Sequence, residues 1–328
     1  MRRLTPALID RFRRDFESAL ENPYDDRPIG IAVSGGGDSV ALLMLAAAAY
    51  PGRVSAATVD HGLRPESGSE ADAVAALCAR LGLAHAILTP AAPIDGGNIQ
   101  EKAREARYAV LAGWTDVHGI GWLLTAHSRD DAAETLLMRA ARGSGISGLA
   151  LMPHNRPIPL AIESPARLIR PLLGWSRSEL RAIAEGAGAP IADDPTNADP
   201  KYDRSRLRAL IAASPDLPAE RLAQAARNLR EAEDALAWLA DEAWTTRCRT
   251  EDGAILLEVD GLPRETRRRL AARAIRALLQ AAGGWSGDGL DGLVARLESG
   301  RAATLAGVSA RPGPPWRFTP APPRARKT

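Results

Sequence analysis

The sequence Ile29-Gly-Ile-Ala-Val33, followed directly by Ser34-Gly-Gly-Gly-Asp-Ser39, decides the fold of this chain. The first five residues are typical of a buried strand, and the apolar run from Val40 to Ala49 predicts a buried helix. Glycines between a strand and a helix let the backbone approach an anion closely, and the helix N-terminus presents free N–H groups to it. This stretch therefore predicts a phosphate-binding site.

The other side chains of the glycine loop suit the same chemistry. Ser34 and Ser39 supply hydroxyl groups, and the carboxylate of Asp38 can hold Mg²⁺ beside a phosphate. The loop lacks the Gly-Lys-Ser/Thr ending of a Walker A motif, and its glycines are contiguous, unlike those of a dinucleotide-binding fingerprint. The alternative is an ordinary strand–helix turn, but three consecutive glycines between two serines and an aspartate argue against it.

Composition excludes several classes of protein. The 328 residues allow two domains, and the 45% hydrophobic and 25% charged residues are ordinary for a globular protein. No run approaches the ~20 apolar residues of a membrane span, and the N-terminus does not resemble a secretory signal. Cys78 and Cys248 lie far apart in the sequence, which supports neither a disulfide framework nor a zinc site. We therefore expect a cytoplasmic protein.

Strands and helices alternate through the first part of the chain. The predicted strands are residues 29–33, 53–60, 85–89 and 121–126, and the predicted helices are 6–20, 40–49, 67–81, 98–117 and 130–142. Such alternation predicts an α/β fold with a doubly wound parallel sheet. Ligands of these sheets bind beyond the carboxyl ends of the strands.

The pattern changes beyond residue 170. Ser176 and Glu179 form a capping-box pattern, and Pro215 and Pro218 mark a linker. Helices are predicted from residue 202 and over 220–249, 264–279 and 285–297, with one strand over 254–259. We therefore predict an N-terminal helix (1–27), a nucleotide-binding catalytic domain (28–215), a smaller, mostly helical domain (216–311) and a free Pro- and Arg-rich tail (312–328).

Charged side chains follow the predicted strands. His61 follows the second strand, and His127, Asp130, Asp131 and Glu134 follow the fourth. Carboxylates one turn apart on a helix face the same side, where they can hold Mg²⁺, receive an ammonium group or act as a base. The alternative is that they only stabilise the helix dipole. Their position on the sheet edge of the glycine loop favours a functional role.

Several arginines offer phosphate contacts. Arg104 and Arg107 lie one turn apart on a predicted helix, and Arg204 and Arg208 share a face of another. Arg64 follows the second strand. Each has the alternative role of a solvated surface charge.

These motifs, in this order, resemble those of the PP-loop ATPases and, more narrowly, of the tRNA(Ile)-lysidine synthetases. The loop Ser34 to Ser39 carries the wider resemblance. The narrower one rests on Val59-Asp-His-Gly-Leu-Arg64, Asn98-Ile-Gln, Ala103-Arg-Glu-Ala-Arg-Tyr108, His127-Ser-Arg-Asp-Asp-Ala-Ala-Glu-Thr135, Arg142-Gly-Ser-Gly-Ile-Ser-Gly-Leu149, Arg170-Pro-Leu-Leu173 and Asp194-Pro-Thr-Asn197. Residues 216–328 resemble the family only by length and helical character.

The resemblance implies a two-step ligation. ATP activates the base carbonyl of the wobble cytidine of an isoleucine tRNA with a CAU anticodon, and the ε-amine of L-lysine then displaces AMP. ATP would be bound by Ser34, Gly35, Gly36, Gly37, Asp38 and Ser39, with Asp38 also at the Mg²⁺. His61, Arg104 and Arg107 would lie close to ATP or the target base. Asp131 and Glu134 would receive the lysine.

Three departures from the family pattern stand out. Ala132 replaces a usual Gln, Ser205 replaces a usual Asn, and we expect the last small domain of longer members to be missing. A PP-loop tRNA thiolase is the nearest alternative, but its chemistry needs paired cysteines. A non-catalytic RNA-binding relative would not need the intact loop and carboxylates, and a small-molecule amidating synthetase would not explain the Arg-bearing C-terminal part. The oligomeric state stays open.

Overall fold

The chain forms two compact units. The computed structural model describes residues 4–22, 24–62, 67–92, 96–159, 161, 164–186, 188, 191, 203–279 and 287–321. The units are Met1–Arg230 and Glu231–Thr328, so they divide after residue 230 and not after 215 as expected from the prolines. The reason lies in α9 (Ala219–Arg247), whose Ala223 and Ala226 are fully buried against Leu151 and Leu173 of the first unit.

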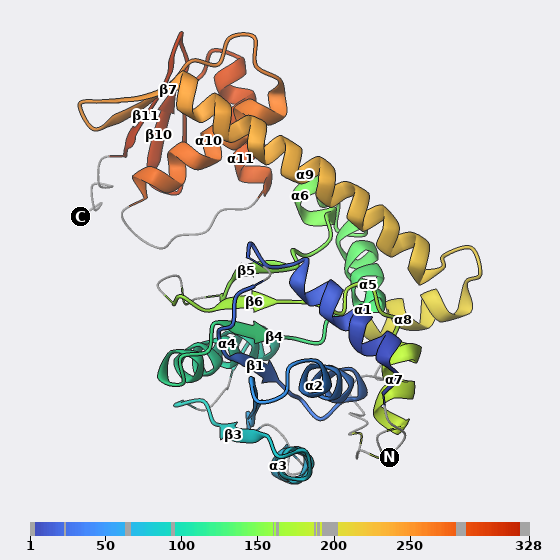
Figure 1. Cartoon of the computed structure of the whole chain (residues 1–328). Coiled ribbons are helices and arrows are strands. Elements are labelled where there is room, and N and C mark those ends of the chain that lie inside the picture. Colours follow the sequence, from blue (N-terminus) through green and yellow to red (C-terminus); the bar gives the residue numbers. More distant parts are fainter. Residues whose placement is uncertain are drawn as a thin grey trace. The chain divides into compact units, whose positions relative to one another are not determined.

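The first unit contains a six-stranded sheet in the order β3-β2-β1-β4-β6-β5 (Figure 1). Its strands are β1 (Ile29–Ala32), β2 (Val54–Val59), β3 (Ala84–Leu88), β4 (Trp122–Leu124), β5 (Asn155–Pro157) and β6 (Arg167–Ile169). Its helices are α1 (Pro6–Glu17), α2 (Gly37–Ala49), α3 (Ser67–Leu81), α4 (Ile99–Val117), α5 (Arg129–Ala140), α6 (Ile146–Leu149), α7 (Arg177–Gly186) and α8 (Asp203–Ala213). The predicted doubly wound parallel sheet is confirmed, with β5 added antiparallel at one edge.

Strand β1 lies at the centre of this sheet and sets its register. Ile29 pairs with Val54 of β2 on one side and with Trp122 of β4 on the other, both in parallel. The three strands therefore end at the same edge. The chain order reverses between β1 and β4, and such a switch point is where ligands of these folds bind.

The two faces of the sheet are covered by different helices. Ile29 and Ile31 of β1 point into a core shared with α1, α2 and α7, whereas Gly30 points to the face covered by α4. There Trp114 of α4 lies so close that a Cβ on Gly30 would come within 2.7 Å of its ring. The central strand therefore needs glycine at this position.

Helix α1 belongs to this core, although the sequence suggested a separate N-terminal part. Phe12 and Phe16 are buried among the side chains of α2. Trp175, just before α7, donates its indole N–H to Asp15 at 2.7 Å, and the guanidinium of Arg11 lies 4.0 Å from the centre of the same ring. Helix α1 therefore holds the start of α7 in place.

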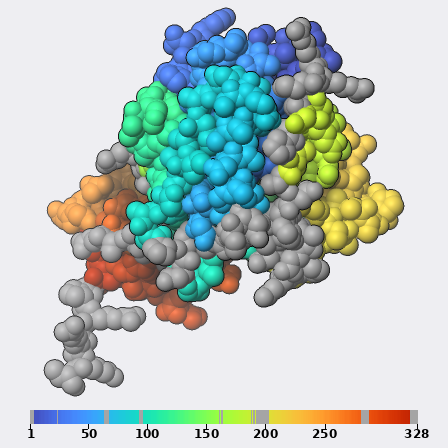
Figure 2. Space-filling model, turned by 90° about the horizontal axis from the view of Figure 1, so that it is seen from below, coloured from blue at the N-terminus to red at the C-terminus, as the bar shows by residue number. Residues whose placement is uncertain are grey.

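Strand β3 is the edge of the sheet opposite β5. Its residues are largely half-buried or exposed, in contrast to the buried residues of β1 and β4. Figure 2 shows this side of the unit, where the cyan residues of α3 and β3 form the surface. Among the described strands, β3 pairs only with β2 in this sheet, and β2 separates it from β1 at the switch point.

The second unit is more β-rich than predicted. Its strands β7 (Cys248–Glu251), β8 (Ala254–Leu257), β9 (Ala303–Leu305), β10 (Val308–Arg311) and β11 (Trp316–Pro320) form an antiparallel sheet in the order β7-β8-β11-β10-β9. Helices α10 (Arg264–Leu278) and α11 (Gly287–Glu298) pack on it. Only the strand at β8, a run of four buried apolar residues, was predicted. β7, β9 and β10 mix polar with apolar residues, and prolines surround β11.

The expectation of a free tail is wrong for Trp316–Pro320. This segment forms β11 between β8 and β10, with Trp316 and Phe318 buried and Arg317 exposed between them. That alternation with a period of two is the pattern of a half-buried strand, which the surrounding prolines obscure. Arg64 and residues 193–197 and 322–328 lie outside the described residues.

We predict that Gly30→Ala destabilises the first unit, because the new methyl group overlaps the Trp114 ring. Overpacking of this kind costs about 1–3 kcal/mol. The measurement is the midpoint of thermal unfolding. Gly113→Ala is the matched control, since a Cβ there meets no atom within 4 Å on helix α4; it should leave the midpoint unchanged or raise it. Equal midpoints for Gly30→Ala and wild type would contradict the close packing.

Candidate active site

The glycine loop is shaped by one buried hydroxyl. Ser39 Oγ donates to the carbonyl of Gly36 at 2.8 Å and accepts from the backbone N–H of Ser34 at 3.2 Å. Gly35 adopts a left-handed conformation with φ of 85°, which favours glycine. Gly36 caps α2 without a side chain. The first-turn N–H groups of α2 have no intrahelical acceptor, and they lie at the carboxyl end of β1.

Helix α5 supplies the carboxylates, and its first turn is held by a capping box. Asp131 Oδ2 accepts from the backbone N–H of Ser128 at 2.8 Å and from its hydroxyl at 3.1 Å. Asp130 accepts from the backbone N–H of Arg177 at 2.9 Å and so caps α7. Glu134, one turn further on, is only 1% exposed. The predicted clustering of carboxylates at this edge is therefore present.

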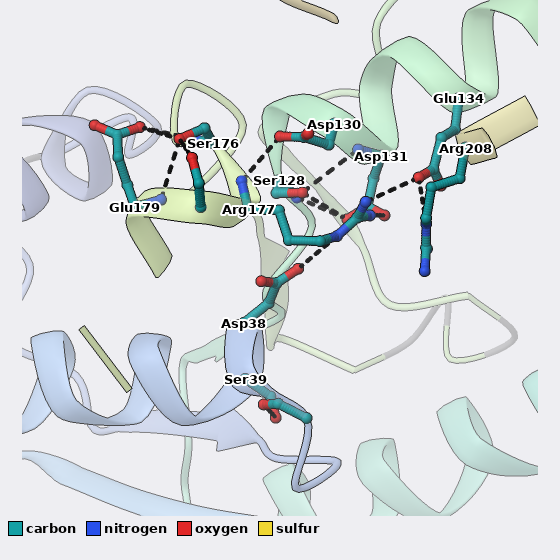
Figure 3. Close-up of polar contacts among 12 residues, drawn as sticks. Asp38, Ser39, Ser128, Asp130, Asp131, Glu134, Ser176, Arg177, Glu179 and Arg208 are labelled. Carbon is teal, nitrogen blue, oxygen red and sulfur yellow. Dashed lines mark hydrogen bonds and ion pairs between the residues drawn. The ribbon is translucent and has the colours of Figure 1, made fainter. Parts of the chain in front are cut away.

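Arg177 joins these carboxylates to the glycine loop. Its guanidinium donates to Asp131 Oδ1 at 3.1 Å and to Glu134 Oε1 at 3.0 Å, and its Nε lies 3.7 Å from Asp38 Oδ2 (Figure 3). Arg177 was not among the predicted site residues. It stands next to the predicted capping box of Ser176 and Glu179, which the structure confirms, but no sequence pattern marks its partners.

A second arginine reaches Glu134. Arg208 of α8 donates to Glu134 Oε1 at 2.9 Å, the same oxygen that Arg177 contacts. Glu134 Oε2 is buried and has no hydrogen-bond partner among the described residues. One oxygen of this buried carboxylate is therefore shared by two cations, and the other is left to accept from a ligand.

The pKa values of Asp38 and Asp131 shift in opposite directions. Burial, followed by the charge of Asp131, raises the pKa of Asp38 to about 6. Burial alone would also raise the pKa of Asp131, but its neighbours, His127 and Arg177 foremost, hold it below the ordinary value. A cation bound beside Asp38 would favour its ionised form and offset both the desolvation and the repulsion from Asp131.

His127 stands at the end of β4 as a neutral group. Desolvation and the charge of Arg170 lower its pKa to about 4. Its Nδ1 lies 3.0 Å from the hydroxyl of Thr125. The charge of Arg104 on α4 also acts on this imidazole, which places Arg104 at the same sheet edge.

His61 and Arg107 form a separate pair. Arg107 Nε lies 3.5 Å from His61 Nε2, and burial together with this positive charge lowers the pKa of His61. If Nε2 accepts from Arg107, the ring proton is on Nδ1, which is buried without a partner in the described residues. No hydrogen bond or ion pair between described residues joins this pair to the carboxylates, so its place at a common site rests on the shared sheet edge.

Ala132, where the family pattern usually has Gln, does not face this site. It is 2% exposed and packs in an apolar cluster with Leu136, Leu151 and Leu173. Helix α5 therefore presents Asp131 to the site and Ala132 to the core. The substitution concerns packing and removes no polar group from the carboxylate cluster.

The described residues contain neither a preformed metal site nor a membrane-spanning helix. No group of three or more His, Cys, Asp and Glu side chains there is arranged to hold a metal ion. None of the described helices has the length and apolarity needed to span a bilayer. A cation at Asp38 would therefore need ligands from a bound phosphate as well, which is the usual way Mg²⁺ is held.

A glycine loop and carboxylates meeting at the switch point of a parallel sheet define a nucleotide-binding α/β enzyme. A family model described as a PP-loop domain matches residues 8–214, which shows an ATP-binding domain. Among solved structures, the U34-tRNA thiolase NcsA from Methanococcus maripaludis is similar with a TM-score of 0.53 at 18% identity, covering 68% of this chain and 79% of that one. At this identity the similarity concerns the fold alone.

Two curated relatives are similar over nearly their whole length. The tRNA(Ile)-lysidine synthase of Zymomonas mobilis is 41% identical over 96% of this chain and 94% of its own. That of Novosphingobium aromaticivorans is 42% identical over 95% and 93%. The chain belongs to the tRNA(Ile)-lysidine synthase family, a family of ligases built on a PP-loop ATP-binding domain.

We predict that His127 makes the fold sensitive to mild acid. Its pKa is 6.5 in an unfolded chain and about 4 when folded, so only the unfolded chain binds this proton in between. Stability is therefore lost as the pH falls from about 6.5 toward 4, at no more than about 1.4 kcal/mol per pH unit.

The measurement is thermal unfolding between pH 7 and pH 5 for wild type and His127→Asn. The asparagine amide can reach Thr125 from the place of Nδ1 and does not titrate, so the midpoint should fall less steeply in the variant. Parallel pH profiles would show that His127 is not the group responsible.

Proposed function

We propose that this chain ligates L-lysine to the wobble cytidine of an isoleucine tRNA with a CAU anticodon, at the expense of ATP. The base oxygen attacks the α-phosphorus of ATP, and pyrophosphate leaves. The ε-amine of lysine then attacks the activated carbon, and AMP leaves, giving lysidine. The single observation that supports this best is that the glycine loop and the buried Glu134 meet at one sheet edge, linked by Arg177.

The loop suits the first step. The unpaired N–H groups at the start of α2 and the hydroxyl of Ser34 can bind phosphate oxygens, which fixes the direction from which the base approaches. His61 and Arg107 would lie near ATP or the target base, with the Nδ1–H of His61 as a donor. Arg104, at the same edge, is a further candidate for these contacts.

Glu134 and Asp131 suit the second step. Glu134 Oε2 is a buried acceptor without a partner among the described residues, and a buried carboxylate strongly favours a cationic guest. Both oxygens of Asp131 are already engaged, by Ser128 and by Arg177. We therefore assign Glu134 to accept the ammonium directly, while Asp131 contributes charge and holds the helix end.

A divalent cation fits beside Asp38. The carboxyl group stands at the first turn of α2, and its pKa is raised by burial first and by the charge of Asp131 second. Mg²⁺ bound there would neutralise charge on the phosphates. Asp38 would supply the protein ligand, and the phosphates of ATP would supply others.

The cysteines weigh against thiolation. Cys78 is buried in the core of the first unit, where desolvation raises the pKa of its thiol to about 11. Cys248 belongs to the second unit, and both are free. A thiol with so high a pKa is a poor nucleophile, so sulfur transfer has no suitable carrier in Cys78.

We predict multiple turnovers of ATP to AMP and pyrophosphate only when L-lysine and the CAU tRNA are both present. The amine completes each cycle, so its omission should limit the protein to a single adenylation. The measurement is AMP release together with transfer of labelled lysine to tRNA. Sustained turnover without lysine, or incorporation of sulfur, would refute the assignment.

We predict that Asp38→Asn and Asp131→Asn affect different steps. Loss of the charge at the phosphates should slow adenylation about 100-fold or more. Asp131→Asn, which can keep the capping hydrogen bond from Ser128, should leave measurable adenylation and block lysine transfer. Single-turnover assays with α-labelled ATP, with and without lysine, separate the steps. Equal loss of both steps in Asp131→Asn would contradict this division.

A further inference from the structure

Arg177 holds the two carboxylates that we assign to the substrate ammonium. Its guanidinium donates to Asp131 Oδ1 and Glu134 Oε1, at 3.1 and 3.0 Å, in the carboxylate pair assigned to lysine. Its side chain is 28% exposed, whereas that of Glu134 is 2% exposed. The guanidinium therefore lies on the solvent side of the buried carboxylate, in the direction from which a ligand arrives.

The backbone of Arg177 is fixed, so only its side chain can move. Its N–H donates to Asp130 at 2.9 Å. The preceding residue, Ser176, is held in a capping box with Glu179 by contacts of 2.7 and 2.8 Å. The guanidinium thus sits at the end of a flexible chain on a rigid base.

A third carboxylate lies close to the same guanidinium. Asp38 Oδ2 lies 3.7 Å from Arg177 Nε, within ion-pair distance but longer than a hydrogen bond. A small side-chain movement toward Asp38 Oδ2 would free Asp131 Oδ1 and keep the arginine paired, with Asp38 Oδ1 left for the cation proposed there. Glu134 would keep its contact with Arg208.

We propose that Arg177 is a resident counter-cation of the amine site, and that the lysine ammonium, entering at Glu134 Oε2, displaces it from Asp131 Oδ1 and Glu134 Oε1. It thereby sets the affinity for lysine. While the amine is absent, it balances two closely spaced carboxylates whose mutual repulsion would otherwise be unrelieved. This inference rests on the proposed lysine ligation and assigns Arg177 a role in binding, not in bond formation.

The need to displace Arg177 weakens lysine binding by a factor set by how often the site is free of the guanidinium. A ligand that binds only the state without Arg177 has its apparent dissociation constant divided by the population of that state. If that population is about one tenth, removal of the guanidinium lowers the KM for lysine about tenfold. A purely structural ion pair predicts the reverse, since its loss would disorder the carboxylates and raise the KM.

The test is steady-state ligation of L-lysine to CAU tRNA by the full chain, at saturating ATP and pH 8. We expect Arg177→Gln to lower the KM for lysine about tenfold with little change in kcat. Arg177→Lys, whose single ammonium cannot donate as a planar fork, should give an intermediate KM. Arg181→Gln is the matched control, because Arg181 lies on the same helix, pairs with Glu185 at 2.8 Å and is 60% exposed.

Chemical rescue separates competition from structure. Guanidinium chloride at millimolar concentration, against NaCl of equal ionic strength, should raise the KM for lysine of Arg177→Ala back toward the wild-type value. It should leave Arg181→Ala unchanged.

A raised or unchanged KM in both Arg177→Gln and Arg177→Lys, with thermal midpoints near that of wild type, would overturn the inference. Loss of kcat at unchanged KM would also overturn it, by assigning Arg177 to the chemistry. Failure of the wild type to ligate lysine would instead refute the proposed function. If Arg177→Gln does not fold, Arg177→Lys and its KM decide.

Discussion

The parallel pairing of β1 with both β2 and β4 is the constraint on which the site depends. It brings three chain segments, from Val33, Asp60 and Thr125 onward, to one edge of the sheet. Gly30 leaves room for Trp114 to pack against β1, and the buried Ser39 hydroxyl sets the loop that follows. The glycine loop and the carboxylates of α5 therefore lie close together although about one hundred residues separate them in the chain.

Charge at this edge is balanced through few atoms. Asp38, Asp131 and Glu134 share the guanidinium of Arg177, and Arg208 adds a second cation at Glu134. The capping role of Asp131 fixes the geometry of this cluster, because a carboxylate bonded to two donors of Ser128 cannot rotate freely. Carboxylates held in this way would keep their positions if one cation were exchanged for another.

Much of the first unit could be predicted from the sequence because its strands and helices are long or strongly apolar. The bounds of α3 match the prediction, and those of α4 and α9 differ from it by one or two residues. β5 and β6 were missed, since three residues give no periodicity. Arg177 was missed for another reason: its partners lie 43 and more residues away, and its own neighbourhood only indicates a helix start. The glycine loop and the carboxylates can be recognised from short sequence motifs. A cation that bridges them can be recognised only from the tertiary structure.

Helix α1 connects the residues around Arg177 to the beginning of the chain. Arg11 contacts Glu179 at 2.9 Å and the carbonyl of Gly174 at 3.0 Å, while Asp15 accepts from Trp175. The residues on both sides of Arg177 are therefore anchored to the first turns of the protein. Truncation into α1, or an affinity tag that strains it, would disturb the position of Arg177 from a segment outside the carboxylate cluster.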